Sequence, residues 1–354
     1  MPTIAIPKES VVGEERVALT PALVGKFTAL GLTVKIASGA GKGINVADEA
    51  YQCEVCHDTK TLYDNSDIIA KVQPPTVEEV ALMKDGAILI AFLYPHLHQD
   101  VVKKLAEKKI TCFAMEEIPR ISRAQDMDAL SSQATIAGYK AVLLAANACK
   151  FFFPMLTTAA GSIKPAKVLV IGVGVAGLQA IATARRLGAL VSAYDVRKEA
   201  KQEAESLGAK FLDLGITAAG SGGYARELTA EEKTLQQEAL KKQLAAQDVV
   251  ITTAGVPGKP APRIITRDMI MAMKAGAVIV DIMAETGGNC ELTQVGTYVH
   301  NGVTMIGTKN ICSLLATNAS EMYARNIFNL LSLLVKDGKI NINWEDEIIR
   351  RINI

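Results

Sequence analysis

The sequence predicts an α/β protein with two Rossmann-like, doubly wound parallel-sheet domains joined by long helices. One observation is the stretch from Lys167 to Asp195, which has the pattern of a strand, a glycine turn, a helix, a second strand and an acid. Another is the alternation of short apolar runs with helical stretches before it, which is typical of a mostly parallel sheet. The third is size, because 354 residues, 49% of them hydrophobic, can form two domains with sizeable cores.

The N-terminal region of the chain alternates short apolar runs with helical stretches. Its first helix begins at Thr20, a suitable N-cap, and Pro21, which suits a first helical turn. The expected strands are Thr3–Ile6, Thr33–Ala37, Ile68–Val72, Ala87–Phe92 and Thr111–Ala114, and the expected helices are Thr20–Leu30, one opening at Ala47–Tyr51, Val77–Met83 and Asp100–Lys108.

A long helical segment, about Ala129–Cys149, is expected to lead into the second domain. The last helix, about Ser320–Val335, is apolar on one face and is expected to pack on the first domain. We therefore expect a discontinuous N-terminal domain of residues 1–130 plus 320–354 and an NAD(H)-binding domain of residues 131–319. The expected strands of the second domain are Lys167–Ile171, Leu190–Tyr194, Asp248–Thr253, Ala277–Asp281 and Thr304–Ile306.

The glycines Gly172, Gly174 and Gly177 have the G-x-G-x-x-G spacing of a dinucleotide-binding turn. The first permits the tight turn, the second lets a pyrophosphate approach the backbone, and the third lets the helix pack against the strand. The following helix, roughly Ala176–Leu187, would direct its free N–H groups toward the pyrophosphate. The alternative is an ordinary strand–helix turn whose glycines serve packing alone.

Asp195 ends the second strand, close to the position about 20 residues past the glycines where an acid holds the adenosine ribose. A carboxylate accepts hydrogen bonds from a ribose 2′-OH and repels a 2′-phosphate, so NAD(H) is favoured over NADP(H). Arg197 is the one opposing signal, because a nearby arginine can bind a 2′-phosphate.

Composition excludes several function classes. The chain has 38 Lys and Arg against 37 Asp and Glu, which gives a formal charge of +1 and no basic block for nucleic acid. No apolar run reaches the ~20 residues of a membrane helix, and the N-terminus lacks the apolar core of a signal peptide. We therefore expect a soluble, cytoplasmic protein that is not itself inserted in a membrane.

Two further segments leave alternatives open. Cys53, Cys56 and His57 match C-x-x-C-H, but without an export signal or a second pair at zinc spacing we expect incidental cysteines and no metal. These cysteines are expected in a helix followed by a polar turn. The glycine-rich segment Gly215–Gly223 is either a functional lid or a surface loop.

The segment from Glu117 to Asn147 reads EIPRISRAQDMDALSSQATIAGYKAVLLAAN. Together with the fingerprint, SGGYA, PGKPAP (Pro257–Pro262) and GGNCE (Gly287–Glu291), it resembles the NAD(H)-binding component of proton-translocating nicotinamide nucleotide transhydrogenases. The resemblance covers nearly the whole chain. It implies the split type of this family, in which the NAD(H)-binding component is a separate subunit.

The resemblance implies that hydride passes from NADH on this chain to NADP⁺ on a partner subunit, coupled to proton translocation by membrane subunits. It implies a catalytic set at the nicotinamide end, with Gln125 orienting the dihydronicotinamide beside Arg120, Asp128 and Ser131. The other cofactor-binding positions that it implies are Ile121, Ser122, Asp126, Met127, Gly172, Gly174, Val175, Ala176, Gly177, Asp195, Val196, Arg197, Gly223, Gln236 and Gly255.

The resemblance also implies partners and location. They are an NADP(H)-binding subunit, a membrane subunit and a second copy of this chain, with peripheral association at the inner membrane through the partner subunits. The family has a mobile loop at the position of Gly215–Tyr224, which favours the lid.

Two alternatives remain. Alanine dehydrogenases share the fold, and Arg16 and Lys71 match their substrate-binding basic residues. The catalytic histidine position of that enzyme falls near Tyr94, with His96 and His98 only nearby, and its catalytic aspartate position falls near Glu285. In a transhydrogenase, Arg16 and Lys71 would instead pair with Glu14, Glu15 or Asp67. The second alternative is an NAD-sensing or scaffold subunit that transfers no hydride.

Overall fold

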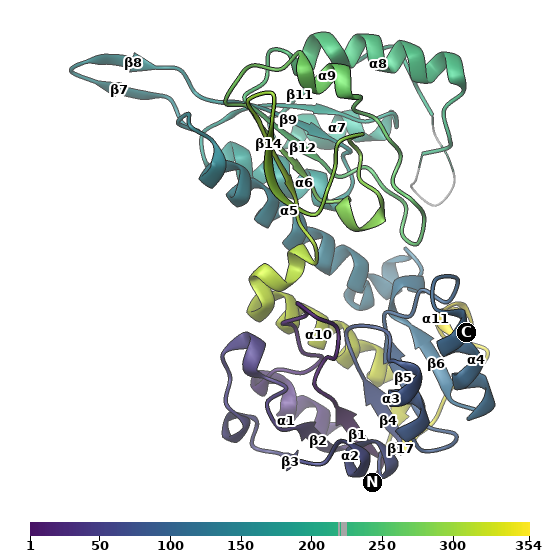
Figure 1. The fold of residues 1–354 in the computed structure, drawn as a ribbon. Helices are drawn as coiled ribbons and strands as arrows, with labels where there is room; N and C mark the ends of the chain where they lie inside the picture. Colours follow the sequence, from purple (N-terminus) through teal and green to yellow (C-terminus); the bar gives the residue numbers. More distant parts are fainter. Residues whose placement is uncertain (219, 221–224) are drawn as a thin grey trace. The chain divides into compact units, whose positions relative to one another are not determined.

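The computed structural model describes residues 1–218, 220 and 225–354 (Figure 1). These residues form two compact units. Unit 1 consists of Met1–Gln133 and Cys312–Ile354, and unit 2 consists of Ala134–Ile311. In the described residues, no helix combines the length and the apolar character needed to cross a membrane.

Unit 1 is built on a six-stranded sheet with the order β3-β2-β1-β4-β5-β6. All neighbouring strands in it are parallel. The order reverses between β1 and β4, which is the topology of a doubly wound fold. The strands are β1 (Thr3–Ile6), β2 (Thr33–Ala37), β3 (Glu54–Cys56), β4 (Ile68–Ala70), β5 (Ile88–Ala91) and β6 (Thr111–Ala114).

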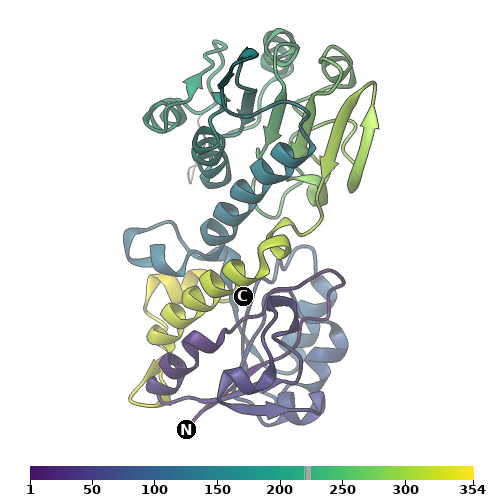
Figure 2. The ribbon, with the colours of Figure 1, turned by 90° about the vertical axis from the view of Figure 1, so that its left-hand side faces the viewer.

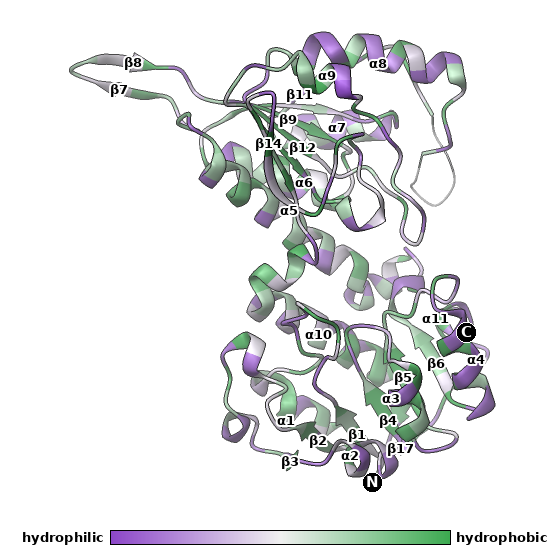
Figure 3. Cartoon of the chain, viewed as in Figure 1, coloured by the Kyte–Doolittle hydropathy of each residue, from purple (hydrophilic) through white to green (hydrophobic). Residues whose placement is uncertain are grey.

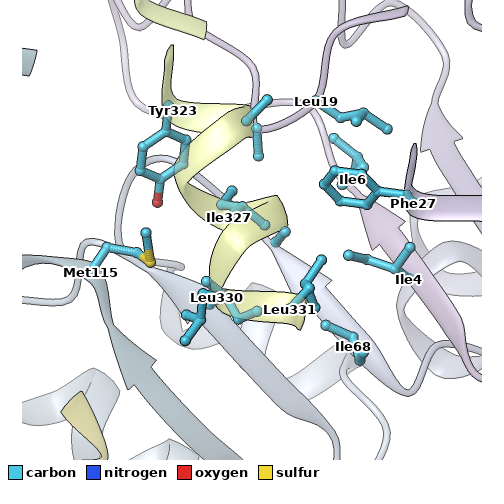
Figure 4. Close-up of a cluster of buried hydrophobic side chains, with 14 of the residues drawn as sticks. Ile4, Ile6, Leu19, Phe27, Ile68, Met115, Tyr323, Ile327, Leu330 and Leu331 are labelled. Atoms are coloured by element: carbon cyan, nitrogen blue, oxygen red, sulfur yellow. The ribbon is translucent and has the colours of Figure 1, made fainter. Parts of the chain in front are cut away.

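Helices cover both faces of this sheet because its strands are apolar on both sides. Ile4 and Ile6 of β1 pack in one cluster with helices α1, α10 and α11, whereas Ala5 packs in another with α2, α3 and α4. Figure 4 shows the first cluster, in which Ile327 and Leu331 of α10 lie beside Ile4 and Phe27. The helices are α1 (Pro21–Ala29), α2 (Thr59–Asp64), α3 (Val77–Leu82), α4 (Gln99–Glu107), α10 (Ala316–Leu334) and α11 (Glu347–Ile352).

Short 3-10 helices and a small hairpin complete unit 1, and α5 (Ala129–Ala148) connects unit 1 to unit 2 along the chain. The hairpin follows α10 and precedes α11. These elements are η1 (Lys42–Ile44), η2 (Asp48–Tyr51), η3 (Met115–Glu117), η4 (Ser122–Met127), β16 (Val335–Lys336) and β17 (Lys339–Ile340).

The prediction of a helix and a polar turn around the two N-terminal cysteines is wrong. The segment forms only the short helix η2, which ends where Gln52 adopts a left-handed conformation at φ +50°. The chain then forms β3, which pairs with β2 at the edge of the sheet. Lys35 and Glu54 form an ion pair of 2.8 Å across these two strands. A strand of three residues depends on such a partner, which the local sequence does not reveal.

Unit 2 is built on a seven-stranded sheet with the order β11-β10-β9-β12-β13-β15-β14. All neighbouring strands are parallel except β14, which pairs antiparallel with β15 at the edge. The sequence did not predict β14. The strands are β9 (Lys167–Ile171), β10 (Leu190–Tyr194), β11 (Lys210–Phe211), β12 (Val249–Thr252), β13 (Val278–Asp281), β14 (Gly296–His300) and β15 (Val303–Gly307).

One face of this sheet is covered by α8 and α9, whose buried residues pack with those of β9, β12 and β13. Figure 2 shows this sheet beside its helices, and Figure 3 shows apolar strands beneath an α8 that carries many hydrophilic residues. A separate hairpin, β7–β8, projects from unit 2 (Figure 1). The remaining elements are α6 (Val175–Arg186), α7 (Glu199–Ser206), α8 (Ala230–Leu244), α9 (Arg267–Met271), η5 (Ala284–Thr286), η6 (Ile311–Leu315), β7 (Leu156–Thr158) and β8 (Gly161–Ile163).

Candidate functional site

Three glycines shape the turn between β9 and α6. Gly172 has φ +90°, and a Cβ on it would lie 2.8 Å from the backbone nitrogen of Ala254. A Cβ on Gly177 would lie 1.9 Å from the carbonyl oxygen of Gly172, so α6 packs directly against the turn. A Cβ on Gly174 would meet nothing within 4 Å. The turn is therefore closed at Gly172 and Gly177 and open at Gly174, where a ligand can approach.

This turn lies where the strand order of the unit 2 sheet reverses, between β9 and β12. Ligands of open α/β sheets bind at the carboxyl ends of the strands at such a point. Thr253 follows β12 and donates a hydrogen bond from Oγ1 to the carbonyl oxygen of Gly172 at 2.8 Å, which joins the two loops. The N–H groups in the first turn of α6 have no partner within the helix, so they can donate to an anionic ligand.

The carboxylate of Asp195, directly after β10, accepts four hydrogen bonds. Its Oδ1 accepts from the backbone nitrogen and Nε of Arg197 at 2.8 and 3.0 Å. Its Oδ2 accepts from Nη2 of Arg197 and from the backbone nitrogen of Val173, both at 2.8 Å. The hydrogen bond to Asp195 is the main cause that raises the pKa of Arg197. Arg197, the opposing signal in the sequence, is therefore neutralised by the acid that favours NAD(H).

Sequence reasoning assigned no role to Asn289, which lies in the GGNCE motif and is fully buried. Its Nδ2 donates to the carbonyl oxygens of Ala254 and Pro262 at 2.7 and 2.8 Å, and its Oδ1 accepts from the nitrogen of Ala254 at 3.1 Å. Asn289 thus joins the GGNCE and PGKPAP motifs to the loop after β12. The signal for it was the joint presence of the two motifs, although neither motif indicates the contact.

The remaining predicted positions of unit 2 differ in their surroundings. Gln236 is buried and donates from Nε2 to the hydroxyl of Tyr194 at 3.0 Å. Gly255 lies against Met283, whose Cε would be 2.2 Å from an added Cβ. Gly223 lies outside the described residues, as does a portion of the segment proposed as a lid. Val175 is 38% exposed at the start of α6, Ala176 is nearly buried behind it, and Val196 packs against the core below α8.

The predicted nicotinamide-binding residues of unit 1 lie in and beside η4. Because a 3-10 helix has three residues per turn, residues three apart form rows along it. Ala124 and Met127 form a buried row within the core. Ser122 and Gln125 form an exposed row. The side chain of Gln125 makes no hydrogen bond with any described residue, so its amide is available.

Asp128 and Ser131 meet at the junction of η4 and α5. The carboxylate of Asp128 accepts from the backbone nitrogen of Ser131 at 2.9 Å and from its Oγ at 2.6 Å. This is the pattern of an N-cap, so the pair fixes the start of α5 in addition to any ligand contact. Ile121 is partly buried against the core, whereas Arg120 and Asp126 are exposed.

Arg16 is buried and bonded to residues of its own unit. Its Nε and Nη2 donate to the two carboxylate oxygens of Glu14 at 2.8 and 2.6 Å, and its Nη1 donates to Gln133 at 2.9 Å. Burial raises the pKa of Glu14, but the hydrogen bonds from Arg16 outweigh it and hold that pKa at about 2. The expected pairing of Arg16 with Glu14 is confirmed.

Lys71 is fully buried and pairs with Glu79 at 2.9 Å and Glu9 at 3.7 Å. The expectation that it pairs with Asp67 is wrong, because Asp67 pairs with Lys84 at 2.7 Å. Both basic residues that an alanine dehydrogenase would use are thus balanced by carboxylates of this chain.

The positions that would supply acid–base groups to an alanine dehydrogenase carry other features. Tyr94 has φ +43°, and its backbone nitrogen donates to the carboxylate of Glu116, as does that of Leu93. His96 is exposed, His98 precedes α4, and Glu285 is exposed in η5. None of these observations favours a proton carrier for oxidative deamination.

Cys53 and Cys56 lie on opposite faces of the unit 1 sheet, packed against different core clusters. Burial raises the pKa of the Cys53 thiol to about 11. Among residues 1–218, 220 and 225–354, no three His, Cys, Asp or Glu side chains are arranged to hold a metal ion.

Two family models match the chain. The alanine dehydrogenase/PNT N-terminal domain matches residues 5–137, and the alanine dehydrogenase/PNT C-terminal domain matches residues 141–354. Together they cover nearly the whole sequence.

Several bacterial proteins are similar along the chain. The first of the separate chains that make up NAD(P) transhydrogenase subunit alpha in Rhodospirillum rubrum is 46% identical over 361 residues, which cover 98% of this chain and 94% of that protein. The alanine dehydrogenase of Halomonas elongata is 30% identical over 315 residues, covering 87% and 80%. The crystal structure of a transhydrogenase from Sinorhizobium meliloti has a TM-score of 0.89 at 41% identity, covering 99% of this chain and 97% of that one. An L-alanine dehydrogenase with a TM-score of 0.81 and 23% identity, covering 99% and 94%, shares the fold.

Proposed function

We propose, from the premise that the chain belongs to the alanine dehydrogenase/PNT family, that it is the NAD(H)-binding subunit of a proton-translocating NAD(P) transhydrogenase. The observation that carries this proposal is 46% identity along almost the full length of a transhydrogenase subunit, against 30% for an alanine dehydrogenase. The chain is then an oxidoreductase that passes hydride between NADH and NADP⁺.

The residues of unit 2 fit a dinucleotide. The open backbone at Gly174 and the first turn of α6 provide N–H donors for a pyrophosphate. Added Cβ atoms at Gly172 and Gly177 would overlap the backbone, so these glycines keep the turn tight. Asp195 supplies a carboxylate for the adenosine ribose at the end of β10.

Residues of unit 1 are proposed for the nicotinamide end, as the family resemblance implies. Gln125 presents an exposed amide, which can donate to and accept from a carboxamide. Arg120, Asp128 and Ser131 are its proposed companions, and the Asp128–Ser131 pair holds the start of α5 beside η4. These residues bind and orient rather than transfer protons.

The chemistry of the step explains why no acid or base is required. When bound, NADH supplies a hydride, which leaves C4 of its ring with both bonding electrons and forms a bond to C4 of the NADP⁺ ring. NADH is oxidised, NADP⁺ is reduced, and no proton changes hands. The chain contributes binding, orientation and exclusion of water.

The names of the relatives support an assembly with other subunits. We propose an NADP(H)-binding subunit as the hydride acceptor, a membrane subunit as the proton path and a second copy of this chain as a homodimer partner. Association with the inner membrane would then run through those subunits.

The test mixes the chain with NADH and an NADP⁺-loaded NADP(H)-binding subunit, with L-alanine and NAD⁺ as a parallel reaction. Transfer that needs both proteins, without alanine turnover, supports the proposal. Alanine turnover by this chain alone would instead establish alanine dehydrogenase activity. NADH binding without transfer in the presence of the partner would indicate an NAD-sensing subunit.

A further inference from the structure

The third row of η4 is bound to two segments that are distant in sequence. Arg123 donates from Nη1 and Nη2 to Oδ2 and Oδ1 of Asp346 at 2.8 and 2.9 Å. The carbonyl oxygen of Asp126 accepts from Nδ2 of Asn326 at 2.8 Å and from Nδ2 of Asn329 at 3.0 Å. The first contact ties η4 to the segment before α11, and the second ties it to α10.

The contact with α10 is made from a rigid support. Asn326 and Asn329 are three residues apart and lie on one side of α10. The neighbouring Tyr323, Ile327 and Leu330 are buried in the core of unit 1 (Figure 4). Movement of η4 relative to α10 would therefore break two hydrogen bonds to one carbonyl group.

Asn326 is not explained by packing. It is 4% exposed, and its Oδ1 has no hydrogen-bond partner among the described residues. A buried acceptor without a partner destabilises a protein by about 1–3 kcal/mol, so an apolar side chain would suit the core better. What Asn326 adds is its donor to Asp126.

The contact with Asp346 also favours orientation over stability. Arg123 is 49% exposed, and ion pairs with exposed partners contribute little to the free energy of unfolding. A two-point contact between a guanidinium and a carboxylate nevertheless fixes their relative orientation. Asp346 itself is anchored, because its Oδ1 also accepts from the nitrogen of Ile348 at 2.8 Å and caps α11.

We propose that Arg123, Asn326, Asn329 and Asp346 are positioning residues that set the rotation of η4 about its axis. This inference rests on the proposed function. Successive residues of a 3-10 helix are separated by roughly 120° of rotation, so a modest rotation of η4 would turn Gln125 away from the direction it now faces. Hydride transfer needs its reacting atoms aligned, and a displacement of about 1 Å can reduce its rate about 100-fold.

The test uses Asn326→Leu, which removes both the donor and the unpaired acceptor, and Asp346→Asn, which removes the charge and keeps a good N-cap. Asn329→Ala is a milder third variant at a half-buried position. Arg325→Lys is the control, because Arg325 lies on the same helix but pairs with Glu321 of that helix. The measurements are NADH affinity, thermal unfolding and single-turnover hydride transfer to NADP⁺ on the NADP(H)-binding subunit.

We expect the transfer rate of Asn326→Leu and Asp346→Asn to fall about tenfold or more while NADH affinity changes less than about threefold. The control should match the unsubstituted chain in all three measurements. Unchanged transfer in both variants, or a loss that follows a fall in NADH affinity or thermal stability, would overturn the inference. Failure of the unsubstituted chain to transfer hydride would instead overturn the proposed function itself.

Discussion

The carboxylate of Asp195 accepts three of its four hydrogen bonds from Arg197 and the fourth from the backbone of Val173. A carboxylate has about four acceptor positions. A ribose hydroxyl can therefore bond to Asp195 only if one of these donors withdraws. The Arg197 side chain is the donor that can move without disturbing the glycine turn, because Val173 lies within that turn.

Asp195→Asn should weaken NADH binding and allow NADPH binding. The substitution removes the negative charge that repels a 2′-phosphate and releases Arg197 to bind one. Because hydrogen bonds to charged groups contribute about 1.5–3 kcal/mol, NADH affinity should fall about 10- to 100-fold. Fluorescence titration with NADH and NADPH measures both effects. Glu205→Gln, an exposed acid on α7, is the charge-matched control and should bind NADH normally.

Arg197→Ala should have the opposite effect on NADH. It leaves Asp195 ionised with free acceptor positions, so NADH affinity should stay the same or rise, and NADPH should remain excluded. The same titration measures this. A large loss of NADH affinity would mean that Arg197 contacts the dinucleotide and does not merely compete for Asp195.

Gly177→Ala and Gly174→Ala should separate folding from binding. The Cβ of the first would lie 1.9 Å from a carbonyl oxygen, so we expect a loss of about 1–3 kcal/mol in the free energy of unfolding. The Cβ of the second meets no atom within 4 Å, so stability should stay within about 0.5 kcal/mol while NADH binding weakens. Calorimetry and NADH titration distinguish the two. Equal destabilisation by both would contradict this account of the turn.

Gln125→Asn should slow hydride transfer about 10- to 100-fold, because the shorter side chain moves its amide by about one bond length. NADH affinity should change little, since the pyrophosphate and ribose contacts are unaltered. Single-turnover kinetics with the NADP(H)-binding subunit measure the rate. A normal rate would remove Gln125 from the proposed catalytic set.

Glu14→Gln should destabilise unit 1 by about 3–5 kcal/mol, because it leaves the buried Arg16 without its anion. The pKa of Glu14 in the folded chain, about 2, lies below the ordinary value of 4.5. The stabilisation is therefore complete above pH 4.5 and is lost as pH falls toward 2. Urea unfolding followed by the fluorescence of Trp344, the only tryptophan and a residue of unit 1, measures both effects. The variant should lack this acid-dependent loss.

The sequence was most informative where structure is local. The strand, turn and helix around Gly172 and the strand ending before Asp195 lie as predicted, since one short segment encodes all of them. The two-domain α/β fold is confirmed as a fold class. Prediction failed where an element depends on a distant partner. The edge strands β3 and β14 form because β2 and β15 offer free edges, which their own residues do not indicate.

Contacts between distant residues were likewise hidden from sequence reasoning. The hydrogen bonds of Asn326 to Asp126 and of Ser313 to Glu14 join residues at opposite ends of the sequence of unit 1. The rows of η4 were also missed, because a single 3-10 helix is too short for its period to be recognised. The nicotinamide-binding roles of Arg120, Gln125, Asp128 and Ser131 stay predictions that rest on family resemblance.

The most direct test of the central claim is a hydride-transfer assay on the unsubstituted chain. NADH bound to this chain is mixed with an NADP⁺-loaded NADP(H)-binding subunit, and NADPH formation is measured with each protein alone and with both together. The account predicts NADPH only when both are present and no NADH from L-alanine and NAD⁺. NADH production from alanine by this chain alone, without NADPH formation in the pair, would contradict it.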